Sequence, residues 1–357
     1  MKKLLKIFDA KHRSRTISYL IVIGIYIAIE LVLNFGKMPS LIKNLLVPCC
    51  CYVTCALALN LCVGISGELS LGHAGFMSIG AFSGVILSGL TASAIPNTII
   101  RLIICIIVGA LITAFFGFLI GIPVLKLRGD YLAIVTLAFC QIIMSLIGNC
   151  YLGFDANGLH FSFIKNEVSL QAGGKMLLSG PIGASGTQRI STFTVGIALI
   201  IITLIIIYNL MYSKNGRAIM ACRDNRIAAS SVGIDVTKTK MLAFVISAGI
   251  AGASGVLYGL NFSTMASSSF SFNQSILILV YVVLGGLGNI TGTIISTVVL
   301  YVLPELLRSL NDYRMIIYSL ILILMMLITN NEKLKSLSSS FIEKLKLKFT
   351  KKKEVQD

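Results

Sequence analysis

The chain has 357 residues, of which 56% are hydrophobic and 12% charged, and its formal net charge is +16. A soluble protein of this length needs far more charge on its surface, so the composition excludes that class. Several apolar runs approach or exceed the ~20 residues that cross a bilayer as a helix, and they do not alternate as the strands of a membrane barrel do. The sequence therefore predicts an all-α, polytopic membrane protein.

The 30 Lys and Arg residues stand mostly in short segments between the apolar runs. There they orient the spans and contact membrane lipid, so we expect no nucleic-acid partner. Most of the nine Cys residues, including Cys49–Cys51, lie in apolar runs, where Cys packs as a small hydrophobe, and we expect no metal. No small-residue cleavage site follows Ile17–Leu33, which we therefore expect to remain as a first span.

The apolar runs predict about ten spans after a basic N-terminus at 1–16. They are expected at 17–33, 41–63, 69–90, 99–125, 131–149, 193–212, 241–262, 275–288, 290–307 and 313–329. Two of the short spans in 264–312 meet at a Gly-rich break, so a re-entrant pair is an alternative there.

Most Lys and Arg residues fall in the N-terminus, the 126–128 turn, the 213–240 segment and a Lys-rich tail at 330–357. By the positive-inside rule these four segments are cytoplasmic, and both termini lie on that side. The long polar stretch 150–192 is then an extracytoplasmic loop within a transmembrane domain that covers 17–329.

Ser213–Lys240 is a polar island between two apolar runs, and its six Lys and Arg residues outnumber its two acidic residues. A break at Asn215-Gly216 and a helix-ending Gly233 predict one short helix over Arg217–Ser231. Its apolar side chains are too few for a core of their own. The pattern indicates an amphipathic helix that lies on the cytoplasmic face and is offered to a soluble partner; the alternative is an ordinary basic loop.

The first Gly-rich interruption, Gly64–Phe76, falls where two predicted spans meet. Unwound backbone at membrane depth is tolerated where it is buried in protein or lines a watery cavity, and broken helices of this kind often flank a substrate path. Its candidate pathway residues are Glu68, Ser70, Gly72, His73 and Gly75. The alternative is a tight turn in which Glu68 is solvated and His73 is a hydrogen-bonded packing residue.

A second interruption, Leu284–Thr293, lies in the other half of the chain. Interrupted segments in both halves are the best sequence indication of a pathway near the membrane midplane. Its candidate pathway residues are Gly285, Gly286, Gly288 and Asn289. The alternative is a hairpin turn between two ordinary spans.

A charged turn at Lys126–Asp130 precedes another span, and Asp130 is placed to cap that helix.

Motifs missing from the sequence restrict the function as well. There is no P-loop to bind ATP phosphates, and no HExxH, CxxC pair or GxSxG motif indicates an enzyme. Intramembrane acids are scarce, so no proton relay is predicted, and energy for pumping would come from a partner.

Several blocks of the sequence resemble one family. They are Glu68–Phe76, Leu127–Leu137, Gly216–Ala218 with Arg223–Asn225 and Ala228–Gly233, and Val283–Gly288, in that order within 40–330. Through them the chain resembles the membrane permease of bacterial branched-chain amino-acid ABC importers. The resemblance implies Gly-broken helices around a central pathway in the bacterial cytoplasmic (inner) membrane. It also implies a second permease subunit in a heterodimer, two ATPase subunits that bind ATP and Mg²⁺, and an extracytoplasmic substrate-binding protein, with no cofactor in this chain itself.

The same resemblance places the ATPase coupling helix in 213–240. The candidate coupling residues are Gly216, Arg217, Arg223, Asp224, Asn225, Arg226, Ala228, Ala229 and Gly233. The family's Glu-Ala-Ala element maps to Ile227-Ala228-Ala229, where this chain lacks the Glu. The implied function is ATP-driven import of Leu, Ile or Val. Permeases for urea or short amides, permeases for sugars or nucleosides, an ion-coupled secondary transporter and a non-transporting membrane scaffold are the alternatives.

Overall fold

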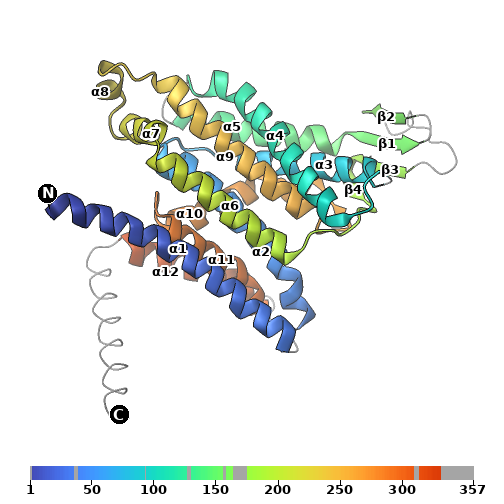
Figure 1. The fold of residues 1–357 in the computed structure, drawn as a ribbon. Helices are drawn as coiled ribbons and strands as arrows, with labels where there is room; N and C mark the ends of the chain where they lie inside the picture. The colour runs from blue at the N-terminus through green and yellow to red at the C-terminus, as the bar shows by residue number, and fades with distance from the viewer. Residues whose placement is uncertain are drawn as a thin grey trace, which may run out of the picture. The chain divides into compact units, whose positions relative to one another are not determined.

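Helices make up most of the protein (Figure 1). The structure is a computed structural model that describes residues 2–35, 39–92, 94–126, 130–155, 158–163, 175–308 and 313–330. Its helices are α1 (Lys2–Phe35), α2 (Ser40–Asn60), α3 (His73–Leu90), α4 (Thr98–Val124), α5 (Asp130–Gly148), α6 (Phe193–Tyr212), α7 (Lys214–Asp224), α8 (Arg226–Ser231), α9 (Val236–Gly259), α10 (Phe272–Gly285), α11 (Ile290–Leu306) and α12 (Arg314–Asn330). Its short strands are β1 (Tyr151–Asp155), β2 (Gly158–Ser162), β3 (Lys175–Ser179), β4 (Ala184–Ser185) and β5 (Thr264–Met265). The all-α class is confirmed, with a small sheet that the sequence did not predict.

The described residues contain eight helices that are long and apolar enough to cross a membrane. They are Arg15–Leu33, Ile42–Ile65, His73–Leu90, Thr98–Val124, Tyr131–Gly148, Phe193–Tyr212, Val236–Gly259 and Ser267–Gly285. Each overlaps a predicted span, although Val236–Gly259 and Ser267–Gly285 begin earlier than the predicted 241–262 and 275–288. The last two predicted spans correspond to the shorter apolar helices Ile290–Leu306 and Arg314–Leu327. The chain is therefore a polytopic membrane protein, as its hydropathy predicts.

Helix α9 is a central packing element, because it lies along α2, α3 and α4. Small residues let these helices approach closely. A Cβ on Gly80 of α3 would clash with the backbone of Gly252 in α9. Beside this contact, the buried rings of Phe76 and Phe244 meet edge to face with centroids 5.6 Å apart. The tight seam fixes α3, whose first turn carries the candidates His73 and Gly75, against α9, which follows the coupling segment.

The strands form one antiparallel sheet in the order β2-β1-β3-β4-β5. Tyr151 of β1 pairs with Ser179 of β3, and Ala184 of β4 pairs with Met265 of β5. Only a polar loop was expected at 150–192, since β5 comes from beyond α9 and such distant pairing leaves no local pattern. In Figure 1 the sheet lies at the end of α9 opposite to α7 and α8.

By its internal contacts the chain divides into two units, Met1–Val298 and Val299–Asp357, with the boundary inside α11. The first unit contains the sheet and every candidate site residue. In the second unit, the described residues include the end of α11 and the whole of α12. Just after α11, Arg308 Nη1 donates to Glu305 Oε1 at 2.9 Å. Residues 331–357 of the predicted Lys-rich tail, residues 127–129 of the charged turn and the side chain of Asp130 lie outside the described part, so the cap stays a prediction.

Candidate functional site

The first predicted interruption is a break between α2 and α3. Helix α2 ends at Asn60 and continues as a π-helical turn over Leu61–Ile65, and the chain is then irregular until α3 begins at His73. Ser66 and Ser70 are buried in the irregular stretch. Gly67 and Leu69 are exposed, so protein covers only part of this unwound backbone.

The second predicted interruption is a tight turn between α10 and α11. Gly285 ends α10, and α11 begins at Ile290. Gly286 and Gly288 have φ angles of 91° and 80°, a left-handed conformation that favours glycine. The exposed Asn289 caps α11, because its Oδ1 accepts a hydrogen bond from the backbone N–H of Gly292 at 3.1 Å.

The two interruptions touch each other through Asn60. Its Oδ1 accepts from the Gly288 N–H at 2.8 Å, and its Nδ2 donates to Thr293 Oγ1 at 2.9 Å. A Cβ on Gly64 would clash with Asn60 and with the backbone of Gly288. Sequence reasoning missed Asn60, although an amide deep within the apolar run 41–63 is the kind of polar residue that joins helices in membranes.

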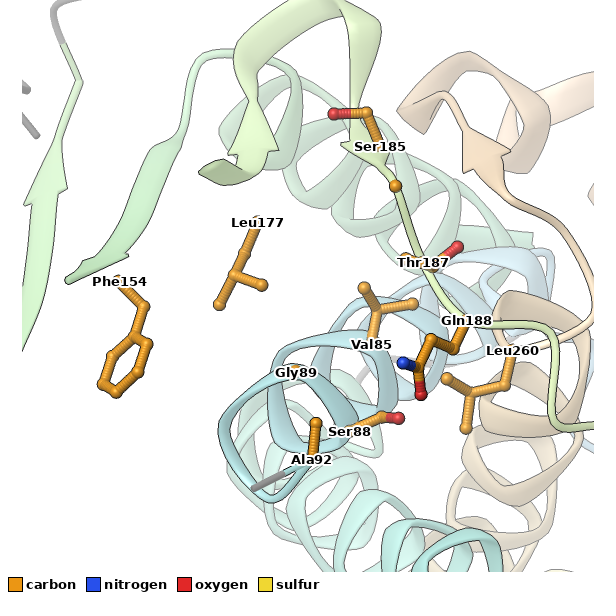
Figure 2. A pocket seen from close by; sticks show the side chains of 11 residues that line it. Val85, Ser88, Gly89, Ala92, Phe154, Leu177, Ser185, Thr187, Gln188 and Leu260 are labelled. Carbon is orange, nitrogen blue, oxygen red and sulfur yellow. The ribbon is translucent and has the colours of Figure 1, made fainter. Parts of the chain in front are cut away.

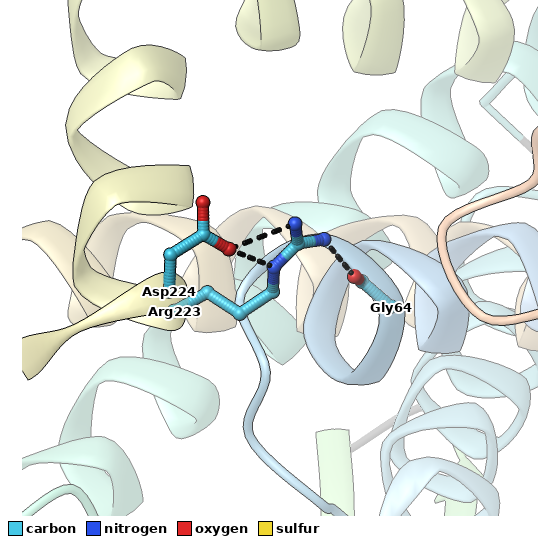
Figure 3. A network of polar contacts seen from close by, with 3 residues as sticks. All are labelled: Gly64, Arg223 and Asp224. Carbon is cyan, nitrogen blue, oxygen red and sulfur yellow. Dashed lines mark hydrogen bonds and ion pairs between the residues drawn. The ribbon is translucent and has the colours of Figure 1, made fainter.

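The coupling segment reaches this cluster through Arg223 of α7. As Figure 3 shows, the guanidinium lies between two acceptors: its Nη1 donates to the Gly64 carbonyl at 2.9 Å, and its Nε and Nη2 donate to Asp224 Oδ1 at 3.1 and 3.0 Å. A hydrogen bond from a charged donor is stronger than a neutral one. The structure therefore brings Arg223 and Asp224, from the coupling prediction, to the break that holds the first pathway candidates.

A second link joins the first break to the start of α9. The carboxylate of Glu68 forms an ion pair with Lys240 Nζ, and the two side chains are only 14% and 10% exposed. Glu68 is thus an ion-paired carboxylate rather than a freely solvated one. Lys240 was not among the candidates, since nothing local in the sequence indicates a partner so far along the chain.

His73 is buried, and both of its ring nitrogens have protein partners. Ser247 Oγ donates to the Ala58 carbonyl at 2.6 Å, so it accepts from His73 Nε2, which is also 2.6 Å away. The other nitrogen, Nδ1, then accepts from the Ser70 hydroxyl at 3.3 Å. This network ties α2, α3 and α9 together and matches the alternative of a hydrogen-bonded packing residue.

Two other candidates from the first motif face α5 instead of the second interruption. A Cβ on Gly72 would clash with the backbone of Thr136, and one on Gly75 would lie 3.0 Å from the Cα of Cys140. Thr136 Oγ1 also accepts from the backbone N–H of Leu71 at 3.0 Å. Gly72 and Gly75 therefore serve a close packing of α3 on α5, apart from the cluster of Asn60, Gly64 and Gly288.

The prediction of one helix over Arg217–Ser231 is wrong, because the segment forms two helices, α7 and α8. Asn225 leaves the helical conformation (φ −153°, ψ 106°), and its Oδ1 caps α8 by accepting from Ile227 N and Ala228 N, each at 3.0 Å. The predicted break at Asn215-Gly216 is wrong as well. Ser213 Oγ accepts from Gly216 N at 3.1 Å and starts α7 earlier.

The remaining coupling candidates differ in exposure. Arg217 is exposed and donates to the Tyr212 carbonyl at 3.1 Å, Arg226 is half-buried, and Ala228 is exposed. Gly233, with φ 84°, follows α8, as predicted for a helix-ending glycine.

The segment also has the small core that its sequence was expected to lack. Cys222, Ala229 and Val236 are buried together with Ile234 beside them, and burial raises the pKa of the Cys222 thiol. By contrast, Ile227 and Val232 are each 79% exposed. These two side chains therefore lie on the surface of the segment, outside its small core.

Residues 41–329 match the family model described as "Branched-chain amino acid transport system / permease component". The chain belongs to this family. It is 35% identical over 286 residues to the high-affinity branched-chain amino acid transport system permease protein LivM of Salmonella typhimurium, a match that covers 77% of this chain and 66% of that protein. LivM of Escherichia coli is 34% identical over the same shares.

LivH of Salmonella typhimurium, a permease protein of the same named system, is 30% identical over 179 residues, which cover 46% of this chain and 58% of LivH. The matched part of this chain thus spans about two thirds of the length of the LivM relatives (66%). No solved structure matches the chain. The family is one of transport permease components, not of enzymes.

Proposed function

We propose that this permease subunit forms the translocation path of an ABC importer for branched-chain amino acids. Its family and the names of its LivM and LivH relatives support the substrate class. The proposed complex contains a second permease subunit, two ATPase subunits that bind ATP and Mg²⁺, and an extracytoplasmic binding protein. This chain supplies the path and the coupling surface, and its partners supply the energy.

The observation that carries the proposal is the hydrogen bond of 2.9 Å from Arg223 in the coupling segment to the Gly64 carbonyl in the first interruption. Gly64 in turn packs against Gly288 of the second interruption. A partner that displaces α7 and α8 would therefore move both broken helices together. Such a displacement favours whichever arrangement of the path the partner binds better.

The ion pair of Glu68 with Lys240 provides a parallel link. Lys240 lies one turn into α9, at the end of the coupling segment 213–240, and Glu68 lies in the first interruption. Two contacts on different helices resist rotation of the segment about a single point. The segment would consequently act on the path as a lever rather than as a loose loop.

The arrangement of α9 supports the proposed orientation. Its N-terminal end adjoins α7 and α8 and its C-terminal end adjoins the sheet, as Figure 1 shows. The Lys and Arg residues of 213–240 favour the cytoplasm for the first of these ends. The sheet would then face the binding protein, and the exposed Ile227 and Val232 would face an ATPase.

The test is transport by the whole complex in proteoliposomes, with the second permease, both ATPases and the binding protein present. We expect leucine, isoleucine or valine to accumulate only with ATP inside and with active ATPases. Accumulation driven by an ion gradient without ATPases would identify a secondary transporter and overturn the proposal. Uptake of a sugar or of urea, with none of leucine, would reject the substrate class alone.

A further inference from the structure

One buried cation plays no part in the site described above. Arg101 lies in the first turn of α4 and is 3% exposed. Its Nη2 donates to Gln188 Oε1 at 2.6 Å, whereas its buried Nε has no hydrogen-bond partner. None of the ion pairs among the described residues includes it. An Arg side chain keeps its charge in proteins, so a buried guanidinium without an anion is energetically unfavourable.

The acceptor of this hydrogen bond lines a cavity. Figure 2 shows Gln188 in the wall of a pocket between the end of α3, the sheet and the residue that follows α9. The pocket has a volume of about 100 Å³, several times the roughly 10–15 Å³ that one water needs. There is therefore room for a small solute beside Gln188; Arg101 itself does not line the pocket and is connected to it through Gln188.

The walls of the pocket have two kinds of surface. Val85, Leu177 and Leu260 present hydrocarbon, and Ser88 presents a hydroxyl group near Gln188, whereas the hydroxyl of Thr187 donates to the Phe262 carbonyl. Small-molecule sites typically combine an apolar wall with a few polar groups that fix orientation. The pocket matches a ligand with one polar end and one short aliphatic end.

We propose that this pocket binds the carboxylate of a short aliphatic amino acid, with the carboxylate at Arg101 and Gln188 and the hydrocarbon on Val85, Leu177 and Leu260. Guanidinium groups bind carboxylates through two parallel N–H donors, and the Gln188 carbonyl now occupies the place of one such oxygen. The assignment of the ligand rests on the proposed function. It adds a substrate site at the sheet end of the path.

The experiment uses the complete permease–ATPase complex in nanodiscs, without the binding protein, and calorimetry with three probes. Leucine carries both charged groups, 4-methylpentanoate lacks the amine, and 3-methylbutylamine lacks the carboxylate. We expect the two carboxylates to bind and the amine not to bind. Arg101→Gln should weaken carboxylate binding about 10–100-fold, the value of a charge-assisted hydrogen bond, and Arg101→Lys should weaken it less.

The matched control is Arg189→Gln. Arg189 is exposed, follows Gln188 directly, and donates to Ser263 Oγ at 3.4 Å, so the variant removes the same charge beside the pocket. If Arg101→Gln does not assemble, Ala92→Phe tests the same site, because this half-buried wall residue would then fill the pocket and abolish binding.

Three results would overturn the inference: equal affinities for Arg101→Gln and Arg189→Gln, binding of the amine as tight as that of leucine, or no binding by a wild-type complex that imports leucine. Failure of the proposed function looks different. It would leave wild-type proteoliposomes without leucine uptake, whereas failure of the inference leaves uptake intact and insensitive to Arg101.

Discussion

Two buried cations, Lys240 in the first turns of α9 and Arg101 in the first turn of α4, have opposite surroundings. As whole residues, Lys240 is 8% exposed and forms an ion pair with Glu68, while Arg101 is 3% exposed and contacts the neutral amide of Gln188. A charge that is paired within the protein fixes one helix against another. A cation without an anion in the protein can pair with an anion that arrives from outside. We therefore treat the Lys240 contact as structural and Arg101 as a binding residue.

The largest predicted effect is on stability, and it tests whether the two buried cations really differ. Lys240→Ala leaves the Glu68 carboxylate largely buried without its partner, and we expect it to destabilise the complex by about 3–5 kcal/mol. Arg101→Gln removes a charge without an ion-pair partner, so it should leave the stability unchanged or raise it. The melting temperatures of the two purified variants measure the difference.

The double variant Glu68→Gln/Lys240→Met is the control for that experiment. It removes both charges, so most of the lost stability should return. If Lys240→Ala melts with the wild type, or if Arg101→Gln is the less stable of the two single variants, the proposed distinction between the cations is wrong.

A second prediction concerns the contact between the interruptions. Gly64→Ala adds a Cβ that clashes with Gly288 and Asn60, and we expect a loss of about 1–3 kcal/mol in stability together with a loss of uptake. Gly24→Ala is the matched control, because nothing lies within 4 Å of a Cβ at that position. Thermal unfolding and leucine uptake are measured on both variants, and equal behaviour would show that the two interruptions do not need to touch.

A third prediction separates coupling from folding. Arg223→Ala removes the donor to the Gly64 carbonyl, a charge-assisted bond worth about 1.5–3 kcal/mol, so uptake per ATP hydrolysed should fall about tenfold or more. Lys214→Ala removes an exposed charge from the same helix and should transport normally. ATPase activity and uptake are measured in the same proteoliposomes. An unchanged ratio in Arg223→Ala would place the coupling elsewhere.

Local patterns predicted much of this fold. Glycine within apolar runs indicated both interruptions, because it is the residue that unwinds helices and lets backbones approach. Hydropathy predicted the spans, because a helix that crosses a bilayer needs about 20 mostly apolar residues. The sequence also contained an unused indication in Asn225, a preferred N-cap residue directly before Arg226–Ser231, which would have divided the coupling segment correctly.

Contacts between distant segments could not be predicted in this way. Arg223 donates to a backbone carbonyl, and Gly64 carries no side chain that would mark it as an acceptor. The strand pairing of Ala184 with Met265 depends on α9 folding back between them. Arg101 was visible as a lone cation at the start of the predicted span 99–125, but only its burial and its contact with Gln188 distinguish it from a residue that sets topology.

The smallest predicted effect tests whether the coupling segment is a folded unit or a loose basic loop. Burial raises the pKa of the Cys222 thiol, so less of it is thiolate, the reactive form, at pH 8 than of an exposed cysteine. Two single-cysteine chains are compared: one keeps Cys222 alone, and the other carries Ala228→Cys alone. Cys222 should react with maleimide more slowly than the cysteine at 228, whose position on α8 is exposed. The folded segment holds this thiol in its protonated form. The stability of the segment should therefore fall as the pH rises above the ordinary thiol range, and the two reaction rates should converge there. Equal rates already at pH 8 would mean that the cluster of Cys222, Ala229 and Val236 is open, and a segment without that core could not act as a rigid lever on Gly64.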